Sequence, residues 1–290
     1  MILLNSQPIR SRQPLIACCR GLPKLEVRPR KAKGGPFGPP IISCPRGVWA
    51  NPVTVSLSTL ELNARRHIWM QAIFDGNDFL VNALAGTISK PRLKRYMYAS
   101  GGDKIKALDL YHWNIELSKA MYFPVQVWEI SLRNRLNSYL SKRFGANWPY
   151  DPIAMRQMTK NDLVKLDKAK GRQQRSRRVR QAPTPTIVAD LSAGFWVSLL
   201  SDSYEVSLSW PTNIGRVFPY DAALDRATAH QICTALLDVR NRIAHHEAIY
   251  SLPLADRRSE AERLVVAMCP GASAHLGGKC SLVGAIAAKP

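Results

Sequence analysis

Residues 124–145 read PVQVWEISLRNRLNSYLSKRFG and carry the clearest helical pattern in the chain. Its apolar residues recur at steps of three and four, which places them on one face of an α-helix: Val125, Trp128, Leu132, Leu136 and Leu140. Pro124 is expected to open this helix, because proline is favoured in the first helical turn. Gly145 and Pro149 are expected to close it.

The segments on both sides carry the same helical spacing. Ser89-Lys90-Pro91 predicts the start of a short helix and Gly101-Gly102 its end, after which Asp103 is expected to cap a helix that runs to Tyr122. No stretch alternates as a β-strand would, so the sequence predicts an all-α fold. Further helices are predicted over residues 186–200, 221–243 and 260–268, with a loop that holds Trp210-Pro211 and Phe218-Pro219.

Composition narrows the class of protein. The chain has 290 residues, and its 41 Lys and Arg outnumber 21 Asp and Glu, for a net charge of +20. Because 46% of the residues are hydrophobic, disorder along the whole chain is excluded. A chain this basic favours nucleic acid or an anionic membrane surface as its partner. No apolar run is long enough for a membrane span or a signal peptide, so a cytoplasmic protein without membrane insertion is expected.

The charge and the prolines are unevenly distributed along the chain. Residues 1–53 hold nine prolines and nine basic residues against the single acid Glu26, which predicts a disordered basic arm. Two interpretations are open: a nucleic-acid-binding tail, or translation from a start placed too far upstream, with Met70 as the alternative; the second is favoured. The predicted organisation is an extension over residues 1–85, a helical domain over 86–270 and a loose glycine-rich tail over 271–290.

Residues 240–247, RNRIAHHE, offer the clearest chemistry. At about 100° per residue, Asn241 and His245 lie one turn apart, while Ile243 points to the core. An arginine, an amide and an imidazole together can hold an anion and move a proton near neutral pH. The alternative is a polar helix end whose cations favour the C-terminal dipole. A zinc site from His245, His246 and Glu247 is disfavoured, because consecutive helical residues diverge and no HExxH spacing is present.

The cysteines add no metal or disulfide prediction. They are too sparse for a disulfide scaffold, none forms a CxxC pair, and no metal or other cofactor is expected. All are interpreted as reduced thiols: Cys18, Cys19, Cys44, Cys233, Cys269 and Cys280.

Several stretches in order resemble one family. RNRIAHHEAIY is similar to the signature of the Abi-like (abortive infection) proteins, whose core is a HEPN domain with an arginine, four to six residues and a histidine. SKPRLKRYMYASGGDKIKALDLYHWNIELSKAMY, WEISLRNRLNSYLSKRFG, DLSAGFWVSLLS and the WP…VFP loop also agree, over about residues 88–268. The resemblance implies a HEPN-like helical bundle that dimerises. It also implies a metal-independent endoribonuclease in anti-phage defence or a toxin role, with an antitoxin protein or RNA as a further partner.

The resemblance also implies roles for particular residues. Arg240 would hold the scissile phosphate, Asn241 would orient the substrate or the imidazole, and His245 would act as acid or base in attack by the 2′-hydroxyl. His246 is a weaker second candidate, and with Arg242 it is expected to form a second pair one turn apart. Non-catalytic RNA binding or regulation by the same module is the alternative function. Anionic lipid attraction by residues 1–53 is a third.

Two further sets of residues complete the predicted site. Glu129 with Arg133 and Asn134 forms another family-like pattern, interpreted as a helix-surface ion pair between Glu129 and Arg133, or else as support for Arg240 or His245. Residues 160–181 carry nine Lys and Arg against Asp162 and Asp167, which indicates either a solvated helix or contact with phosphates. The predicted RNA-gripping residues are Lys168, Lys170, Arg172, Arg175, Arg177, Arg178 and Arg180.

Overall fold

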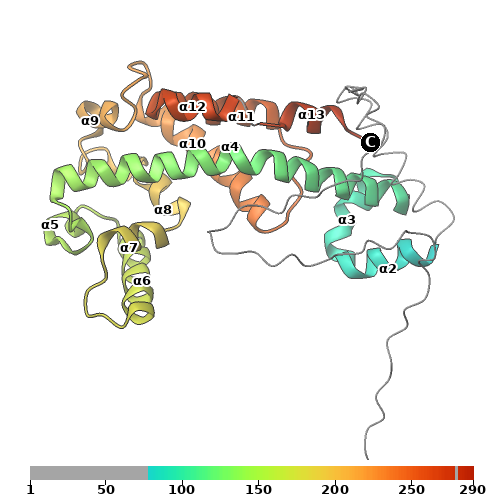
Figure 1. Cartoon of the computed structure of the whole chain (residues 1–290), viewed down its shortest axis with the longest axis horizontal. Helices are drawn as coiled ribbons and strands as arrows, with labels where there is room; N and C mark the ends of the chain where they lie inside the picture. The colour runs from blue at the N-terminus through green and yellow to red at the C-terminus, as the bar shows by residue number, and fades with distance from the viewer. Residues whose placement is uncertain (1–77, 278–279) are drawn as a thin grey trace, which may run out of the picture. The chain divides into compact units, whose positions relative to one another are not determined.

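The computed structural model describes residues 78–277 and 280–290, and within these ranges every regular element is a helix (Figure 1). The predicted all-α class is therefore confirmed for this part of the chain. The predicted basic arm and the alternative start at Met70 lie outside the described residues. The elements are α2 (Asp78–Ile88), α3 (Lys90–Ala99), α4 (Lys104–Phe144), η1 (Trp148–Tyr150), α5 (Pro152–Arg156), α6 (Lys160–Arg177), α7 (Thr184–Asp190), α8 (Ala193–Ser198), η2 (Asp202–Tyr204), α9 (Trp210–Val217), α10 (Arg226–Ala244), α11 (Leu254–Met268), α12 (Pro270–Gly277) and α13 (Leu282–Ala287).

Helix α4 is the element against which most others pack, and it has 41 residues. At about 1.5 Å per residue it is roughly 60 Å long. The prediction that Pro124 opens a new helix is wrong, because Pro124 lies inside α4. Proline has no N–H, so the carbonyl of Ala120 loses its usual helical partner. Buried Met121 and Val125 flank the proline, and this apolar packing holds the helix through the missing hydrogen bond.

The predicted ends of α4 are confirmed. The Asp103 side chain accepts hydrogen bonds from the N–H groups of Ile105 and Lys106 at 3.0 and 3.1 Å. Gly101 and Gly102, with φ of 62° and 88°, take the left-handed backbone that ends α3 and turns the chain. At the other end, Gly145 has φ of 90°. Capping and glycine chemistry therefore fix where this helix begins and ends.

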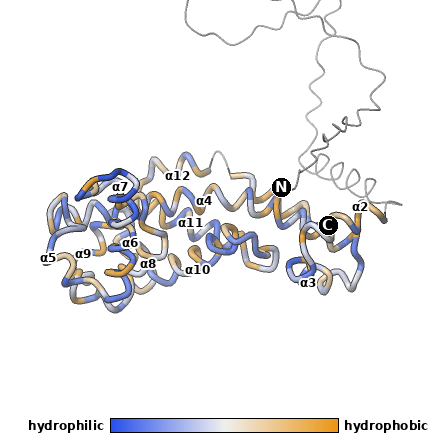
Figure 2. The backbone as a smooth tube through the Cα atoms, turned by 90° about the horizontal axis from the view of Figure 1, so that it is seen from below, coloured by the Kyte–Doolittle hydropathy of each residue, from blue (hydrophilic) through white to orange (hydrophobic). Residues whose placement is uncertain are grey.

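The main core lies along α4 and includes four tryptophans that are almost completely buried: Trp128, Trp148, Trp196 and Trp210. Apolar and polar residues alternate along the helices, as expected when each helix buries one face (Figure 2). A smaller core joins α2 and α3 to the N-terminal half of α4, through Val81, Leu93, Tyr96, Ala107 and Leu108. Since Val81 belongs to this core, the helical domain includes residues before the predicted boundary at 85/86.

Three other predicted boundaries are also wrong. The predicted helix over 186–200 is two helices, α7 and α8, separated at Leu191 and Ser192. The segment predicted as a loop around Trp210-Pro211 forms α9, because proline suits a first helical turn. Helix α10 is capped by Asp225, not Asp221, and the Asp225 carboxylate accepts a hydrogen bond from the Thr228 N–H at 2.6 Å.

The C-terminal segment is more ordered than the sequence predicts. In place of a loose tail, α12 and α13 pack on α4, and Leu276 and Leu282 are buried. The indole N–H of Trp113 donates to the carbonyl of Ala285 at 2.7 Å, and the rings of Phe123 and His275 lie 5.4 Å apart. Apolar contacts with α4 therefore outweigh the helix-weakening effect of the glycines here.

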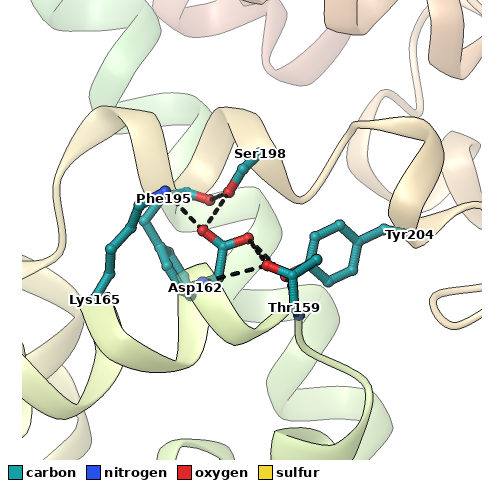
Figure 3. Close-up of polar contacts among 6 residues, drawn as sticks. All are labelled: Thr159, Asp162, Lys165, Phe195, Ser198 and Tyr204. Carbon is teal, nitrogen blue, oxygen red and sulfur yellow. Dashed lines mark hydrogen bonds and ion pairs between the residues drawn. The ribbon is translucent and has the colours of Figure 1, made fainter.

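A buried carboxylate holds α6 to the rest of the fold (Figure 3). The Asp162 side chain is 3% exposed and accepts hydrogen bonds from Tyr204 at 2.8 Å and Ser198 at 2.9 Å. It also forms an ion pair with Lys165 at 2.7 Å and accepts from the Thr159 hydroxyl at 2.9 Å. Burial alone would raise the pKa of Asp162, but these hydrogen bonds outweigh it and lower the pKa. The carboxylate is thus charged and saturated with partners.

Among the described residues, no helix combines the length and the apolar composition that crossing a membrane requires.

Candidate functional site

Helix α10 carries the RNRIAHHE segment at its C-terminal end. Its inner face is buried along most of its length, at Ala229, Ile232, Cys233, Leu236 and Val239. Ile243 continues this face and packs against the main core, as the spacing predicts. The opposite face stays accessible, so Asn241 and His245 are both exposed. The burial of one face therefore determines which side chains the helix end presents to solvent.

Arg240 is held by a carboxylate from α4. Its Nε donates to Oε2 of Glu129 at 3.0 Å, and the two side chains are 37% and 25% exposed. The two terminal nitrogens of the guanidinium make no hydrogen bond within the described part of the chain. One edge of Arg240 is therefore fixed by the protein, and the other edge is available to an anion.

The interpretation of Glu129 and Arg133 as a helix-surface ion pair is wrong. Glu129 pairs with Arg240 on a different helix, which matches the second interpretation, support for Arg240. The Nε of Arg133 is buried without a hydrogen-bond partner among the described residues, and Asn134 is exposed. The spacing of Glu129 and Arg133 on α4 does not reveal that Arg240 on α10 is the partner of Glu129.

The end of α10 is a Schellman motif built from non-glycine residues. His245 is the C-cap, and its N–H donates to the Asn241 carbonyl at 2.9 Å. The N–H of His246 donates to the Ile243 carbonyl at 3.1 Å, and the N–H of Glu247 donates to the Arg242 carbonyl at 2.7 Å. These are the hydrogen bonds that define the motif. His246 therefore takes the left-handed conformation, with φ of 56°, where glycine is usual.

This turn overturns one predicted pair. Arg242 and His246 do not lie one turn apart on a helix, because the helix ends before His246. Arg242 instead forms an ion pair with Asp238 at 2.8 Å, on the helix surface. Arg240, Asn241 and His245 remain close in sequence at the helix end, but no hydrogen bond joins their side chains within the described residues.

A buried amide of α4 holds the chain that follows this turn. Asn114 is 4% exposed, and its Oδ1 accepts from the N–H groups of Ile249 and Tyr250 at 2.7 and 3.1 Å. Its Nδ2 donates to the Glu247 carbonyl at 3.4 Å. The helical spacing in the sequence does not single out Asn114. The available signal was a lone amide on the apolar side of α4, close to Trp113 and Leu117.

Helix α3 supplies a second contact to the turn, also missed. The Nη1 of Arg92 donates to the His246 carbonyl at 2.9 Å. Beside this contact lies an open pocket of about 400 Å³. The side chains that give it polar character are Ser89, Arg92, Arg95, Tyr96, His246 and Glu247. The signal in the sequence was the basic run SKPRLKR. The spacing of its residues predicts a helix, but it does not predict that this helix lies beside the turn after α10.

Tyr96 forms the inner wall of this pocket. Its ring is 2% exposed and packs against the rings of Tyr111 and Tyr250, at 5.3 and 5.4 Å between centroids. Burial, with a smaller effect from the neighbouring Tyr111 and Tyr250, raises the pKa of Tyr96 to about 12. The hydroxyl therefore keeps its proton at neutral pH, and it has no hydrogen-bond partner within the described residues.

The predicted RNA-gripping residues lie on and after α6, away from this site. The ring of Tyr150, near the C-terminal end of α4, lies 5.2 Å from the Nζ of Lys170. Tyr150 also accepts a hydrogen bond from the N–H of Ala182 at 3.0 Å. Asp162 ties α6 to Ser198 and Tyr204, close to the N-terminal end of α10, where Arg226 donates to the Leu200 carbonyl. The candidate site is at the other end of α10, a helix about 28 Å long over its 19 residues.

Two of the predicted RNA-gripping residues are already paired. Lys170 is 8% exposed and lies 3.3 Å from Asp167, so it cannot grip RNA from the surface. Arg172 forms an ion pair with Asp190 at 2.9 Å. The others are exposed, and no ion pair engages them within the described part: Lys168, Arg175, Arg177, Arg178 and Arg180.

In residues 78–277 and 280–290, no three His, Cys, Asp or Glu side chains lie close enough together to hold a metal ion. The cysteines described, Cys233, Cys269 and Cys280, are free thiols, and Cys18, Cys19 and Cys44 lie outside the described residues. No family model, no curated protein and no solved structure matches this chain.

Proposed function

We propose that the protein is a metal-independent endoribonuclease of the HEPN type, acting as an Abi-like protein in anti-phage defence or as a toxin. The observation that carries this proposal is the state of Arg240. Glu129 fixes its Nε, while its terminal nitrogens have no partner among the described residues, and the exposed Asn241 and His245 follow one and five residues later. A guanidinium oriented in advance stabilises a charged transition state without reorganising during the reaction.

In the proposed reaction, Arg240 binds the non-bridging oxygens of the scissile phosphate through its free edge. The His245 imidazole takes the proton of the ribose 2′-hydroxyl, and O2′ attacks phosphorus. The bond from phosphorus to O5′ breaks, the departing 5′-oxygen takes a proton from water, and the His245 imidazolium returns its proton to water. The products are a 2′,3′-cyclic phosphate and a 5′-hydroxyl, and only RNA supplies the nucleophile. Asn241 orients the substrate or the imidazole.

Exposed apolar residues on α4 support a homodimer. Ile115, Tyr122 and Ile130 are 37%, 54% and 39% exposed, and their spacing places them on one side of the helix. Burying them in a second copy would remove apolar surface from water. In this proposal the dimer brings two Arg240 and His245 sets to one cleft, an antitoxin protein or RNA neutralises the enzyme, and the protein acts in the cytoplasm.

The test is cleavage of labelled single-stranded RNA by the full chain in excess chelator. His245→Ala is expected to lower the cleavage rate by about 10²- to 10⁴-fold, because it removes the proton acceptor. His230→Ala is the matched control, since it removes another imidazole of the same helix. An oligonucleotide of the same sequence with 2′-deoxy sugars should bind and stay intact, because it lacks the attacking hydroxyl. Cleavage that survives in His245→Ala, or that proceeds on the deoxy substrate, would overturn the mechanism.

The second candidate is a non-catalytic RNA-binding or regulatory module of the same type. One observation favours it: the His245 imidazole has no hydrogen-bond partner within the described residues, so no protein group fixes its tautomer. In this case wild type and His245→Ala would bind RNA equally and neither would cleave it.

A further inference from the structure

The pocket between α3 and the turn after α10 has a composition suited to an anion. Arg92 and Arg95 lie one helical turn apart, and both line the pocket together with His246. Arg95 makes no hydrogen bond or ion pair within the described part of the chain, and Arg92 makes one, to a neutral carbonyl. Glu247 is the single carboxylate in the lining, and it forms no ion pair with either arginine. The guanidinium groups of Arg92 and Arg95 therefore repel each other, and no carboxylate among the described residues forms an ion pair with either of them.

The backbone adds positive potential to the same place. Ser89 and Pro91, at the start of α3, both line the pocket. Pro91 has no N–H to offer an anion, but Ser89 makes no side-chain cap, so the positive end of this helix dipole is not neutralised by its N-cap side chain. A helix N-terminus in this state favours a phosphate.

A third, independent feature is a hydrogen-bond donor without an acceptor. Tyr96 lines the pocket, and its hydroxyl is buried and without a hydrogen-bond partner among the described residues. A buried hydroxyl without a partner is destabilising, because it has lost its hydrogen bonds to water and gained none in the protein. An anion that enters this pocket would bring acceptor oxygens close to Tyr96. Phenylalanine would fill the same space without a hydroxyl, so an anion would explain why this residue is a tyrosine.

The position of the pocket indicates where the anion comes from. His246 belongs both to the pocket lining and to the turn that directly follows His245. We propose that this pocket binds a phosphate group of the RNA strand next to the phosphate held by Arg240. This assignment rests on the proposed function for its substrate class, and it adds a subsite on α3 that sets affinity without touching the reacting atoms.

The test measures the affinity of the full chain for a fluorescent 2′-O-methyl oligoribonucleotide, which cannot be cleaved. Arg95→Ala is expected to weaken binding about tenfold, the effect of losing one charge-assisted phosphate contact. The slope of log affinity against log salt should fall by about one. Lys94→Ala is the matched control, because Lys94 is exposed on the same helix outside the pocket lining, and it should change affinity less than about twofold. Arg95→Lys should restore part of the loss.

A second arm separates the strand from free phosphate. If inorganic phosphate raises the melting temperature of wild type but not of Arg95→Ala, while the oligonucleotide binds both alike, the strand assignment is wrong. If neither ligand distinguishes the two proteins, the pocket is not a phosphate site. Circular dichroism checks that Arg95→Ala is folded, and Arg95→Gln serves as the second variant if it is not.

Failure of the subsite and failure of the nuclease give different results. Cleavage that depends on His245 with unchanged affinity in Arg95→Ala would reject only the subsite. Weakened binding in Arg95→Ala with no cleavage by wild type would reject only the nuclease.

Discussion

Two basic regions of the molecule differ in what surrounds their charges. The α6 region has the higher density of Lys and Arg, but Lys165, Lys170 and Arg172 pair with carboxylates, and the rest project from an exposed surface. The region around α3 and the end of α10 has fewer cations, yet Arg92, Arg95 and His246 line one pocket. A high density of basic residues in the sequence and the convergence of basic side chains on one pocket are therefore two different properties of this molecule.

The largest expected effect is on the anchoring of α6. Asp162→Ala should lower the free energy of unfolding by about 3 kcal/mol, because Tyr204 and Ser198 lose their acceptor and Lys165 loses its ion pair. Urea denaturation followed by circular dichroism measures this. Asp167→Ala, which removes an exposed carboxylate of the same helix, should change it by less than about 1 kcal/mol. Equal effects would mean that the two carboxylates contribute alike.

The next effect concerns the scaffold of the candidate site. Asn114→Ala should lower the free energy of unfolding by about 2 kcal/mol, since it leaves the N–H groups of Ile249 and Tyr250 without their acceptor. It should also raise hydrogen exchange in residues 245–250 before it affects α6. Exchange followed by mass spectrometry checks this order. Uniform loosening of both regions would contradict the view that Asn114 acts locally.

A third prediction separates positioning from binding. Glu129→Gln should lower the cleavage rate about tenfold, because an amide holds the Arg240 guanidinium less strongly than a carboxylate does. RNA affinity should change less than about twofold, because Gln leaves the free edge of Arg240 in place. Single-turnover cleavage and equilibrium binding give the two values. A loss of affinity without a loss of rate would place Glu129 outside the reaction.

The fourth prediction compares the two basic regions directly. On a short oligonucleotide, replacing Arg175, Arg177 and Arg178 together by alanine should weaken binding only about two- to threefold, by lowering the general positive potential. This triple change should therefore have less effect than Arg95→Ala alone. If the triple variant is the weaker binder, α6 is the main RNA surface and the charge density of the sequence was the better guide.

The smallest effect is an acid-induced one. The pKa of Asp162 is lowered by its hydrogen bonds, so its contribution to stability is present above the ordinary carboxyl value of 3.8 and is lost as the pH falls below it. The difference in unfolding free energy between wild type and Asp162→Asn should be constant from pH 7 to about pH 5 and shrink below pH 3.8. Urea titrations over this range test it, and a constant difference down to pH 3 would mean that the charge contributes nothing.

The sequence predicts local structure well where one residue type determines the backbone. Asp103, the Gly101-Gly102 pair and Gly145 end or cap helices where expected, and the spacing of Trp128 and Leu132 places a buried face correctly. The prediction for Pro124 failed because packing on both sides outweighs a single lost hydrogen bond.

The candidate site was predicted only in part, for a related reason. Residues close in sequence were found, since helical periodicity relates Asn241 and His245, and the family resemblance adds Arg240. The partners supplied by other helices, Glu129 to Arg240 and Arg92 to the turn, depend on tertiary packing that periodicity does not encode. His246 shows the same limit: its left-handed conformation follows from the Schellman hydrogen bonds, and a non-glycine residue gives little warning of it.

The length of helix α4 sets the interval between the turn that Asn114 holds and the α6 region. Asn114 holds the turn near one end of α4, and Tyr150, which follows the other end, contacts α6. The helix from Asn114 to Phe144 is roughly 45 Å long at about 1.5 Å per residue, which corresponds to about 13 stacked nucleotides at about 3.4 Å each. If both basic regions bind RNA, an oligonucleotide shorter than this interval reaches only one of them. The affinity should then increase abruptly at the length that reaches both regions, and not gradually with each added nucleotide.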